Sequence, residues 1–149
     1  MDKLDDKKTA MNQKKLDLIV AEHALWLADP LTGYQADFRW DDLRGLDLCG
    51  ANLFGIDFRW ADCREADFRG ALCRNANFRW ANCRDADFCW ANCREANFRG
   101  ANLRKANFRE ANLCEADFRF ADLRDADLRY AGIHGTSFFE ADVRGVILD

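Results

Sequence analysis

The sequence has few of the features that mark enzymes, membrane proteins or nucleic-acid-binding proteins. It has two histidines, no Ser–His or Cys–His pairing and no glycine-rich phosphate loop, so we expect a protein that is not an enzyme. No stretch approaches the ~20 apolar residues of a membrane span. The net charge is −4, and the acidic and basic residues are interleaved, which excludes a polycation adapted to nucleic acid.

A secretion signal is also missing at the start of the sequence. The residues after Met1 are mostly charged and lack the apolar core of a signal peptide. Seven cysteines without such a signal are typical of a reducing compartment, where disulfides are rare. We therefore expect the protein to be cytoplasmic.

What the sequence does have is a five-residue repeat, which begins at Ala36 and continues to the C-terminus. The middle residue of each unit, called the centre below, is Phe, Leu, Cys, Ile or Val throughout. The residue two before the centre is mostly Ala, the residue directly before it is mostly Asp or Asn, and the residue directly after it is mostly Arg. A fixed period of this kind is typical of a solenoid, in which each unit packs on its neighbours.

The spacing of the apolar residues indicates extended chain. Residues two apart in extended chain face the same side, so we expect Ala and the centre to point inward and the other three residues to face water. Apolar pairs that recur every five residues do not stay on one face of an α-helix.

Two longer periods are superimposed on the first. From residue 58 to residue 98 the centres alternate between Phe and Cys, and the aromatic residues Trp40, Trp60 and Trp80 are spaced by twenty. A coil with four five-residue sides accounts for all three periods, and it stacks positions twenty apart at roughly 4.7–4.8 Å in about six coils. One column of centres would then form a continuous internal ladder: Phe38, Phe58, Phe78, Phe98, Phe118 and Phe138.

The pattern Ala-(Asp/Asn)-(Leu/Phe)-X-X, in which X is any residue, resembles that of the pentapeptide-repeat family over residues 36–149. The resemblance implies an all-β solenoid, namely a right-handed quadrilateral (four-sided) parallel β-helix. The units at both ends depart from the pattern, as terminal units that cap a solenoid usually do.

Ahead of the repeats, the sequence predicts an N-terminal α-helical cap at residues 9–29. One helical stripe is approximated by Leu16, Ile19, Val20, His23 and Leu27. The group of helix breakers around Pro30 ends this pattern. We expect the helix to cover the edge of the first coil, which would otherwise template aggregation. Residues 1–8 are predicted to be a disordered tail and residues 30–35 a linker.

Four cysteines are centres and should face inward: Cys63, Cys73, Cys83 and Cys93. Four thiolates could suit zinc, but pairs spaced by ten and buried between Phe layers are not a zinc-finger arrangement. A free cysteine otherwise behaves as a small buried hydrophobe, so we predict core packing and no metal or cofactor. The remaining cysteines, Cys49, Cys89 and Cys114, follow centres and are predicted to be surface thiols.

The residues that follow the Phe column predict an outward row of arginines and aromatic rings. This candidate interaction face consists of Arg39, Trp40, Arg59, Trp60, Arg79, Trp80, Arg99, Arg119 and Phe120. Exposed aromatic patches often mark binding sites, and Trp and Arg are enriched in interface hot spots. Alternatively, the rings and arginine stems only stack on one another and stabilise the coil. Direct nucleic-acid binding is not expected, because Asp37, Asp57 and Asp117 border the column and would repel phosphate.

The last coil remains apolar and forms a second candidate surface. Its residues are Phe138, Phe139, Val146, Ile147 and Leu148. The resemblance implies a homodimer through this end, because family members that dimerise tend to do so there. The alternative is that Phe139 or Tyr130 folds over the end.

We therefore expect a non-enzymatic rod that acts as a protein-interaction or scaffold module, with a protein partner that the sequence does not name. The resemblance also implies an alternative, since quinolone-resistance members of the family mimic DNA and bind DNA gyrase or topoisomerase IV. The arginines make these repeats nearly neutral, whereas DNA mimicry requires a dominant negative field. The sequence also lacks the looped insertions and the C-terminal capping helix of those proteins.

Overall fold

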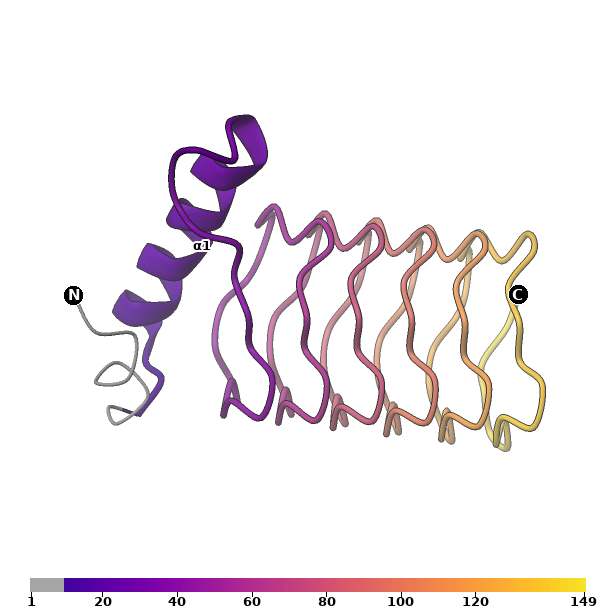
Figure 1. The fold of residues 1–149 in the computed structure, drawn as a ribbon. Helices are drawn as coiled ribbons and strands as arrows, with labels where there is room; N and C mark the ends of the chain where they lie inside the picture. Colours follow the sequence, from indigo (N-terminus) through magenta and orange to yellow (C-terminus); the bar gives the residue numbers. More distant parts are fainter. Residues whose placement is uncertain (1–9) are drawn as a thin grey trace.

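The structure, a computed structural model, describes residues 10–149 as a helix followed by a four-sided coil (Figure 1). The helix lies at one end of the stacked coils, and the C-terminus lies at the other end. The disordered tail predicted at residues 1–8 falls outside the described residues. Within residues 10–149, no helix has the length and apolar character needed to cross a membrane.

Helix α1 (Gln13–Ala28) occupies most of the range in which the sequence predicts a helix. It begins after Asn12, whose side-chain oxygen accepts a hydrogen bond from the backbone N–H of Lys15 at 3.0 Å, as N-cap residues do. It ends at Asp29, and the chain then turns back along the helix at Gly33. Gly33 has a φ of 64°, and a Cβ atom there would collide with the carbonyl oxygen of Glu22, so only glycine fits this close approach.

Each five-residue unit forms one side of the coil and one tight turn. The residue before the centre makes a parallel bridge to the residue twenty positions later, as Asp37 does to Asp57. The turn is closed by a hydrogen bond from the Asp41 N–H to the Phe38 carbonyl at 3.1 Å, and Trp40 in this turn has a φ of 68°. Because every side is this short, the sides pair through single bridges in place of extended strands. The spacing of twenty fixes four sides per coil.

The interior is built from two aromatic ladders. Phe58 and Phe78 stack almost parallel with their ring centroids 4.6 Å apart, and the other members of the predicted Phe column continue this stack. The opposite side carries a second stack, in which Phe68 and Phe88 are also 4.6 Å apart. Rings of the two stacks meet edge to face, as Phe58 and Phe68 do at 5.8 Å. Both arrangements are favourable for aromatic pairs, so the ladders fix the position of each coil on the next.

The other interior columns hold the cysteine centres, all of which are buried. A hydrogen bond with Cys83 and burial raise the pKa of the Cys63 thiol well above its usual value, and burial together with Cys73 does the same for Cys93. These thiols are therefore protonated packing groups. The prediction that Cys89 is a surface thiol is wrong, because Cys89 is buried between Arg69 and Arg109 of the neighbouring coils.

Helix α1 contacts the first coil through apolar residues, including Leu16, Ile19 and Val20, and through two polar ones. Leu16 is fully buried in the core, and the Gln13 amide forms two hydrogen bonds of 2.8 Å with the backbone N–H and carbonyl of Asp47. His23 is also fully buried: its Nδ1 accepts from the Ala36 N–H at 3.2 Å, so its Nε2 donates to the Phe54 carbonyl at 3.0 Å. In later coils the counterparts of the Asp47 groups and of the Phe54 carbonyl pair with the preceding coil, whereas the counterpart of the Ala36 N–H closes a turn, as the Ile56 N–H does with the Leu53 carbonyl. Gln13 and His23 thus replace hydrogen bonds of a coil that does not exist.

Candidate interaction face

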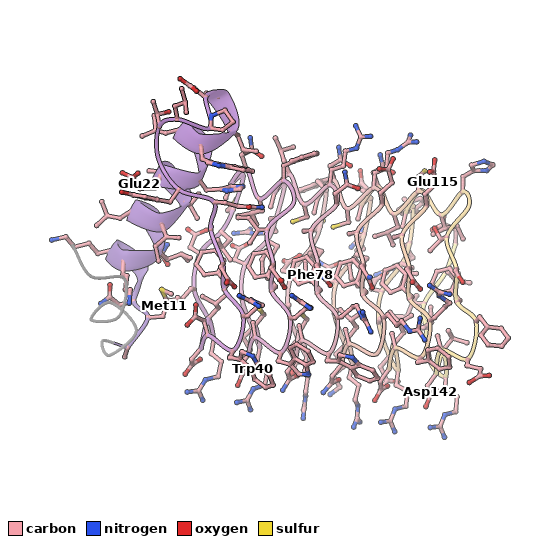
Figure 2. The ribbon with its side chains drawn as sticks, in the orientation of Figure 1. Met11, Glu22, Trp40, Phe78, Glu115 and Asp142 are labelled. Carbon is pink, nitrogen blue, oxygen red and sulfur yellow. The ribbon has the colours of Figure 1, made fainter. Side chains whose placement is uncertain are left out.

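The candidate residues lie along one corner of the coil and the side that leads into it. We call this surface the Arg–Trp face, defined by the nine residues given above. Phe78 lies inside the coil, whereas Trp40 projects from it (Figure 2). The indole rings remain accessible, since Trp40 is 70% exposed, Trp60 40% and Trp80 48%. The positive φ of each corner residue aims its side chain outward, so the backbone places the rings in a column.

The rings of this column are held in different ways along the coil. Trp40 and Trp60 stack in parallel at 4.6 Å, and Arg59 lies over the Trp60 ring at 5.8 Å. One coil further on, the Trp80 ring leans over Gly100, whose missing side chain leaves the space for it. Beyond Gly100, Phe120 is covered by the guanidinium of Arg99 at 4.9 Å, a cation–π contact.

An aspartate neutralises the arginine of the same unit in many turns of the coil. The Arg59 Nη2 donates to the Asp57 carboxylate at 2.6 Å, its Nε donates at 2.9 Å, and its backbone N–H donates at 3.0 Å. The same hydrogen bonds lower the pKa of Asp117, which pairs with Arg119. Pairs of this kind also occur at Asp37–Arg39, Asp42–Arg44, Asp62–Arg64, Asp67–Arg69, Asp122–Arg124, Asp127–Arg129 and Asp142–Arg144.

In the middle coils asparagine takes the place of aspartate, and the arginine then lacks the carboxylate two residues before it. Asn77 still accepts the backbone N–H of Arg79 at 3.2 Å, and Asn97 accepts that of Arg99 at 3.0 Å. The Nε of Arg79 is nevertheless buried without a hydrogen-bond partner in the described structure. In the sequence analysis, Asp and Asn at this position are treated as equivalent, although only Asp can pair with the arginine two residues later.

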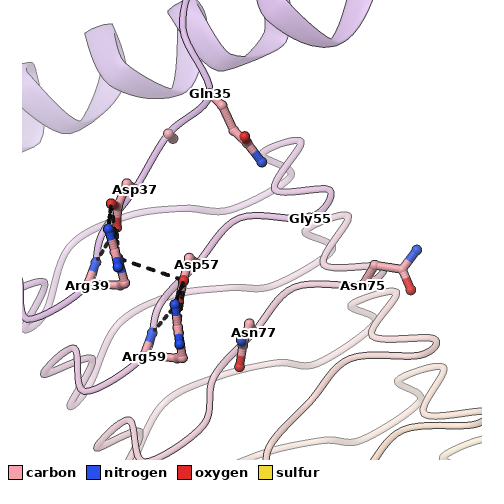
Figure 3. A pocket seen from close by; sticks show the side chains of 9 residues that line it. Gln35, Asp37, Arg39, Gly55, Asp57, Arg59, Asn75 and Asn77 are labelled. Carbon is pink, nitrogen blue, oxygen red and sulfur yellow. Dashed lines mark hydrogen bonds and ion pairs between the residues drawn. The ribbon is translucent and has the colours of Figure 1, made fainter.

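A hollow of about 580 Å³ borders this face at the N-terminal coils. Its charged lining consists of Asp37, Arg39, Asp57 and Arg59, and Figure 3 shows the two aspartates bonded to the two arginines. Arg39 also reaches the Asp57 carboxylate of the next coil at 3.8 Å. The carboxylates are therefore engaged in ion pairs, and the hollow holds no histidine, thiol or hydroxyl that could act as a nucleophile.

The family of this protein follows from comparison with known sequences. The family model described as "Pentapeptide repeats" matches residues 56–92, 81–119, 91–129 and 106–145, in eight copies. The chain belongs to the pentapeptide-repeat family. A search of curated proteins found no match.

Solved pentapeptide-repeat structures have the same fold, a right-handed quadrilateral β-helix. QnrB1, a plasmid-mediated fluoroquinolone resistance protein, is 20% identical with a TM-score of 0.53, and the match covers 78% of this chain and 66% of that one. Rfr23 from the cyanobacterium Cyanothece 51142 is 18% identical with a TM-score of 0.50, over 87% and 95% of the two chains. A protein from the Arabidopsis thaliana thylakoid lumen is 27% identical with a TM-score of 0.47, over 73% and 66%. The match thus spans just under two thirds of that trypsin-treated QnrB1 chain.

The C-terminal candidate residues of this pentapeptide-repeat protein lie in its last described coil. Phe138 continues the internal ladder and is partly buried against the core, as is Val146. Phe139, Ile147 and Leu148 are exposed. The Phe139 ring meets Phe120 edge to face at 6.2 Å, so it joins the outer column and does not fold over the end.

Proposed function

We propose that this pentapeptide-repeat protein is a non-enzymatic interaction or scaffold module that presents the Arg–Trp face to a protein partner. The observation that carries the proposal is the exposure of Trp40, Trp60 and Trp80 in one column on a rigid backbone. Exposed aromatic columns of this kind suit partner recognition, because Trp and Arg supply large contact areas and strong hydrogen bonds in hot spots.

The absence of catalysis is part of this proposal. The aspartates that might resemble catalytic carboxylates repeat along the coil and are bonded to arginines, as Asp57 is to Arg59. The four interior thiols are fully buried. A hydrogen bond with Cys83 and burial raise the pKa of Cys63, and burial raises the pKa of Cys93, which makes these two poor nucleophiles and metal ligands. We propose that no cofactor is needed and that the seven free cysteines belong to a reducing, cytoplasmic environment.

We further propose that α1 acts as the cap of a rod of about six coils. Two features support this role. The α1 side chains of Gln13 and His23 satisfy backbone groups of the first coil, and Leu16 covers its apolar interior. A covered edge removes a template for strand addition, so the rod would remain soluble at this end.

Homodimerisation through the C-terminal coil is a further proposal. The exposed residues Phe139, Ile147 and Leu148 form an apolar surface at the edge of the last described coil, which suits self-association. Sedimentation velocity over a wide concentration range tests it. We expect a dimer that dissociates when Ile147 and Leu148 are changed to Asp, and a concentration-independent monomer would contradict the proposal.

A DNA-mimic role at DNA gyrase or topoisomerase IV is the alternative function. Its support is the fold shared with QnrB1. The Asp–Arg pairs weaken it, because many of the carboxylates that would imitate phosphates are neutralised by the arginine two residues later, as Asp57 and Asp117 are. A gyrase supercoiling assay separates the two functions, since inhibition at stoichiometric protein would establish the alternative.

Affinity capture from a cell lysate tests the main proposal. The bait is either the wild type or a variant in which Trp40, Trp60 and Trp80 are changed to Ala, and a variant with Arg69 changed to Ala on another side is the matched control. We expect the wild type and the control to capture a partner protein that the Trp variant does not capture. Loss of stability in the Trp variant without any captured partner would identify the column as a stabilising feature of the coil only.

A further inference from the structure

Four arginines of the middle coils have no ion pair with any described residue: Arg79, Arg99, Arg104 and Arg109. Each lies in a unit in which asparagine stands directly before the centre, as Asn77 does in the unit of Arg79. Other arginines after asparagine are neutralised from the corners, as Arg94 is by Glu95 and Glu115. The two Nε groups of Arg79 and Arg104 are buried without acceptors. Buried cationic donors without partners are rare in native proteins. Both side chains are only partly buried, so the rest of each guanidinium can still meet an acceptor from outside.

Three of these arginines surround one exposed ring. Arg79 and Arg99 occupy the same column in successive coils, and Arg104 follows Arg99 around the corner at Gly100. Trp80 leans over Gly100 and so lies at the corner between them. We call Arg79, Trp80, Arg99 and Arg104 the open-arginine patch. Successive coils are roughly 4.8 Å apart, so the backbone places Arg79 and Arg99 one coil spacing from each other, while the Arg99 guanidinium extends over the Phe120 ring of the following coil. An anion beside this column would meet two cations.

We propose that the open-arginine patch docks a short acidic segment of the partner protein, whose carboxylates occupy the positions that aspartates fill elsewhere in the coil. This inference rests on the proposed function and adds the chemistry of the partner. The pair of Asp57 and Arg59 shows the geometry that a carboxylate adopts beside this arginine position, with donation from Nη2 at 2.6 Å. Bonds of this charge-assisted kind are about twice as strong as neutral ones. Trp80 adds an apolar contact beside them.

The extent of the patch favours a short peptide over nucleic acid. In the preceding coil Asp57 neutralises Arg59, and in the following coil Asp117 neutralises Arg119. Along this column the patch is therefore limited to the coils of Arg79 and Arg99. A long polyanion along the rod would meet these carboxylates and the net charge of −4. A segment with two or three carboxylates needs only the two coils that carry Arg79 and Arg99.

Fluorescence anisotropy with a labelled peptide of alternating glutamate and glycine tests the inference. The key variant combines Asn77→Asp with Asn97→Asp, which supplies internal carboxylates and keeps every arginine. These changes recreate the units found at Asp57 and Asp117, so the variant is expected to fold. We expect its affinity for the peptide to be weaker by about tenfold or more, because each closed arginine loses a charge-assisted contact.

Controls address specificity and the role of the arginines. Arg69→Ala removes an arginine that is already paired with Asp67 and lies outside the Arg–Trp face, and it should leave peptide binding within about twofold. Arg79→Ala with Arg99→Ala should weaken it as the aspartate variant does. A peptide with glutamine in place of glutamate should not bind.

Two results would overturn the inference. The first is equal peptide affinity of the wild type and the Asn77→Asp, Asn97→Asp variant, or no binding to either. The second is tighter binding of an oligothymidylate of equal length, which would make the patch a nucleic-acid site. Affinity capture with the same variant separates this failure from failure of the proposed function: a partner retained by the aspartate variant and lost by the Trp variant refutes only the acidic segment.

Discussion

Asp57 accepts hydrogen bonds from both the backbone N–H and the guanidinium of Arg59, so one carboxylate closes the turn and neutralises the side chain that leaves it. This contact spans only two residues and is repeated around the coil. The repeated contact explains why a surface with many charged residues produces only a weak long-range electrostatic potential. It also makes the middle coils distinct, because an asparagine there closes the turn through Asn77 and leaves Arg79 charged.

The aspartate–arginine pairs should make the free energy of unfolding depend on pH in the acidic range. Arginine hydrogen bonds lower the pKa of Asp42 and of Asp142 from 3.8 to about 2. Because the folded pKa lies below the unfolded one, their stabilisation is complete above the unfolded value and is lost as the pH falls from 3.8 toward about 2. Thermal unfolding followed by circular dichroism across this window should show the loss. The double variant Asp42→Asn, Asp142→Asn should show a shallower decline, and an identical decline would contradict the assignment.

The aromatic ladder predicts a large difference between inward and outward positions. Phe78→Ala removes a fully buried ring that stacks on Phe58 and Phe98, and it should destabilise the fold by about 3–5 kcal/mol. Arg119→Ala removes an exposed ion pair and should change stability by about 1 kcal/mol or less. Chemical denaturation of both variants measures this difference. Equal unfolding midpoints would show that the inward and outward positions are misassigned.

Substitution of Gly100 tests whether the Trp80 ring lies over it. Its φ of 67° disfavours any side chain, and a Cβ atom would collide with the Trp80 ring. Gly70→Ala is the matched control, because Gly70 has a φ of 63° but open space around its Cβ position. Both variants should lose about 1 kcal/mol from backbone strain, and Gly100→Ala should lose more. Adding Trp80→Ala should remove the excess, whereas equal losses in the two glycine variants would place Trp80 elsewhere.

His23 predicts that the contact between α1 and the first coil depends on pH. Burial lowers the pKa of His23 below 6.5, against a smaller raising effect of its bond to the Phe54 carbonyl. The contact is therefore fully stable above 6.5 and weakens as the pH falls toward the folded value, where Nδ1 would gain a proton facing the Ala36 N–H. Limited proteolysis of α1 should accelerate between about pH 7 and pH 5 in the wild type. His23→Gln should remove most of that change, and the same acceleration in the variant would exclude His23 as its cause.

The sequence predicted the coil well because one period governs the whole fold. Four sides, the Phe column and the outward Trp column all follow from the spacing of residues such as Phe58 and Trp60. The contacts of Gln13 and His23 with the first coil could not be predicted, because they depend on where α1 lies in space. Cys89 was assigned to the surface because its position in the unit faces outward, yet it is buried in the structure, in the same column as Arg69 and Arg109 of the adjacent coils.

The sequence predicted which residues form the candidate site, but not which of its arginines are neutralised. The arginine column was recognised as uniform, while the distinction between Arg59 and Arg79 depends on the oxygen or nitrogen of a neighbouring side chain. The space beside Gly100 is also filled, since the Trp80 ring leans into it. Both features arise from contacts between residues one coil or two positions apart, and the amino-acid sequence alone does not show these contacts.

Site-specific photo-crosslinking in cells tests most directly whether the Arg–Trp face binds a protein. A photo-reactive amino acid replaces Trp60 in one version of the protein and Glu110, at the opposite corner of the coil, in another. Both positions are exposed and have the same positive φ, so the two versions differ in the face that they report on. We predict a discrete crosslinked protein from position 60 and none from position 110. No crosslink from position 60, or the same products from both positions, would contradict the proposed function.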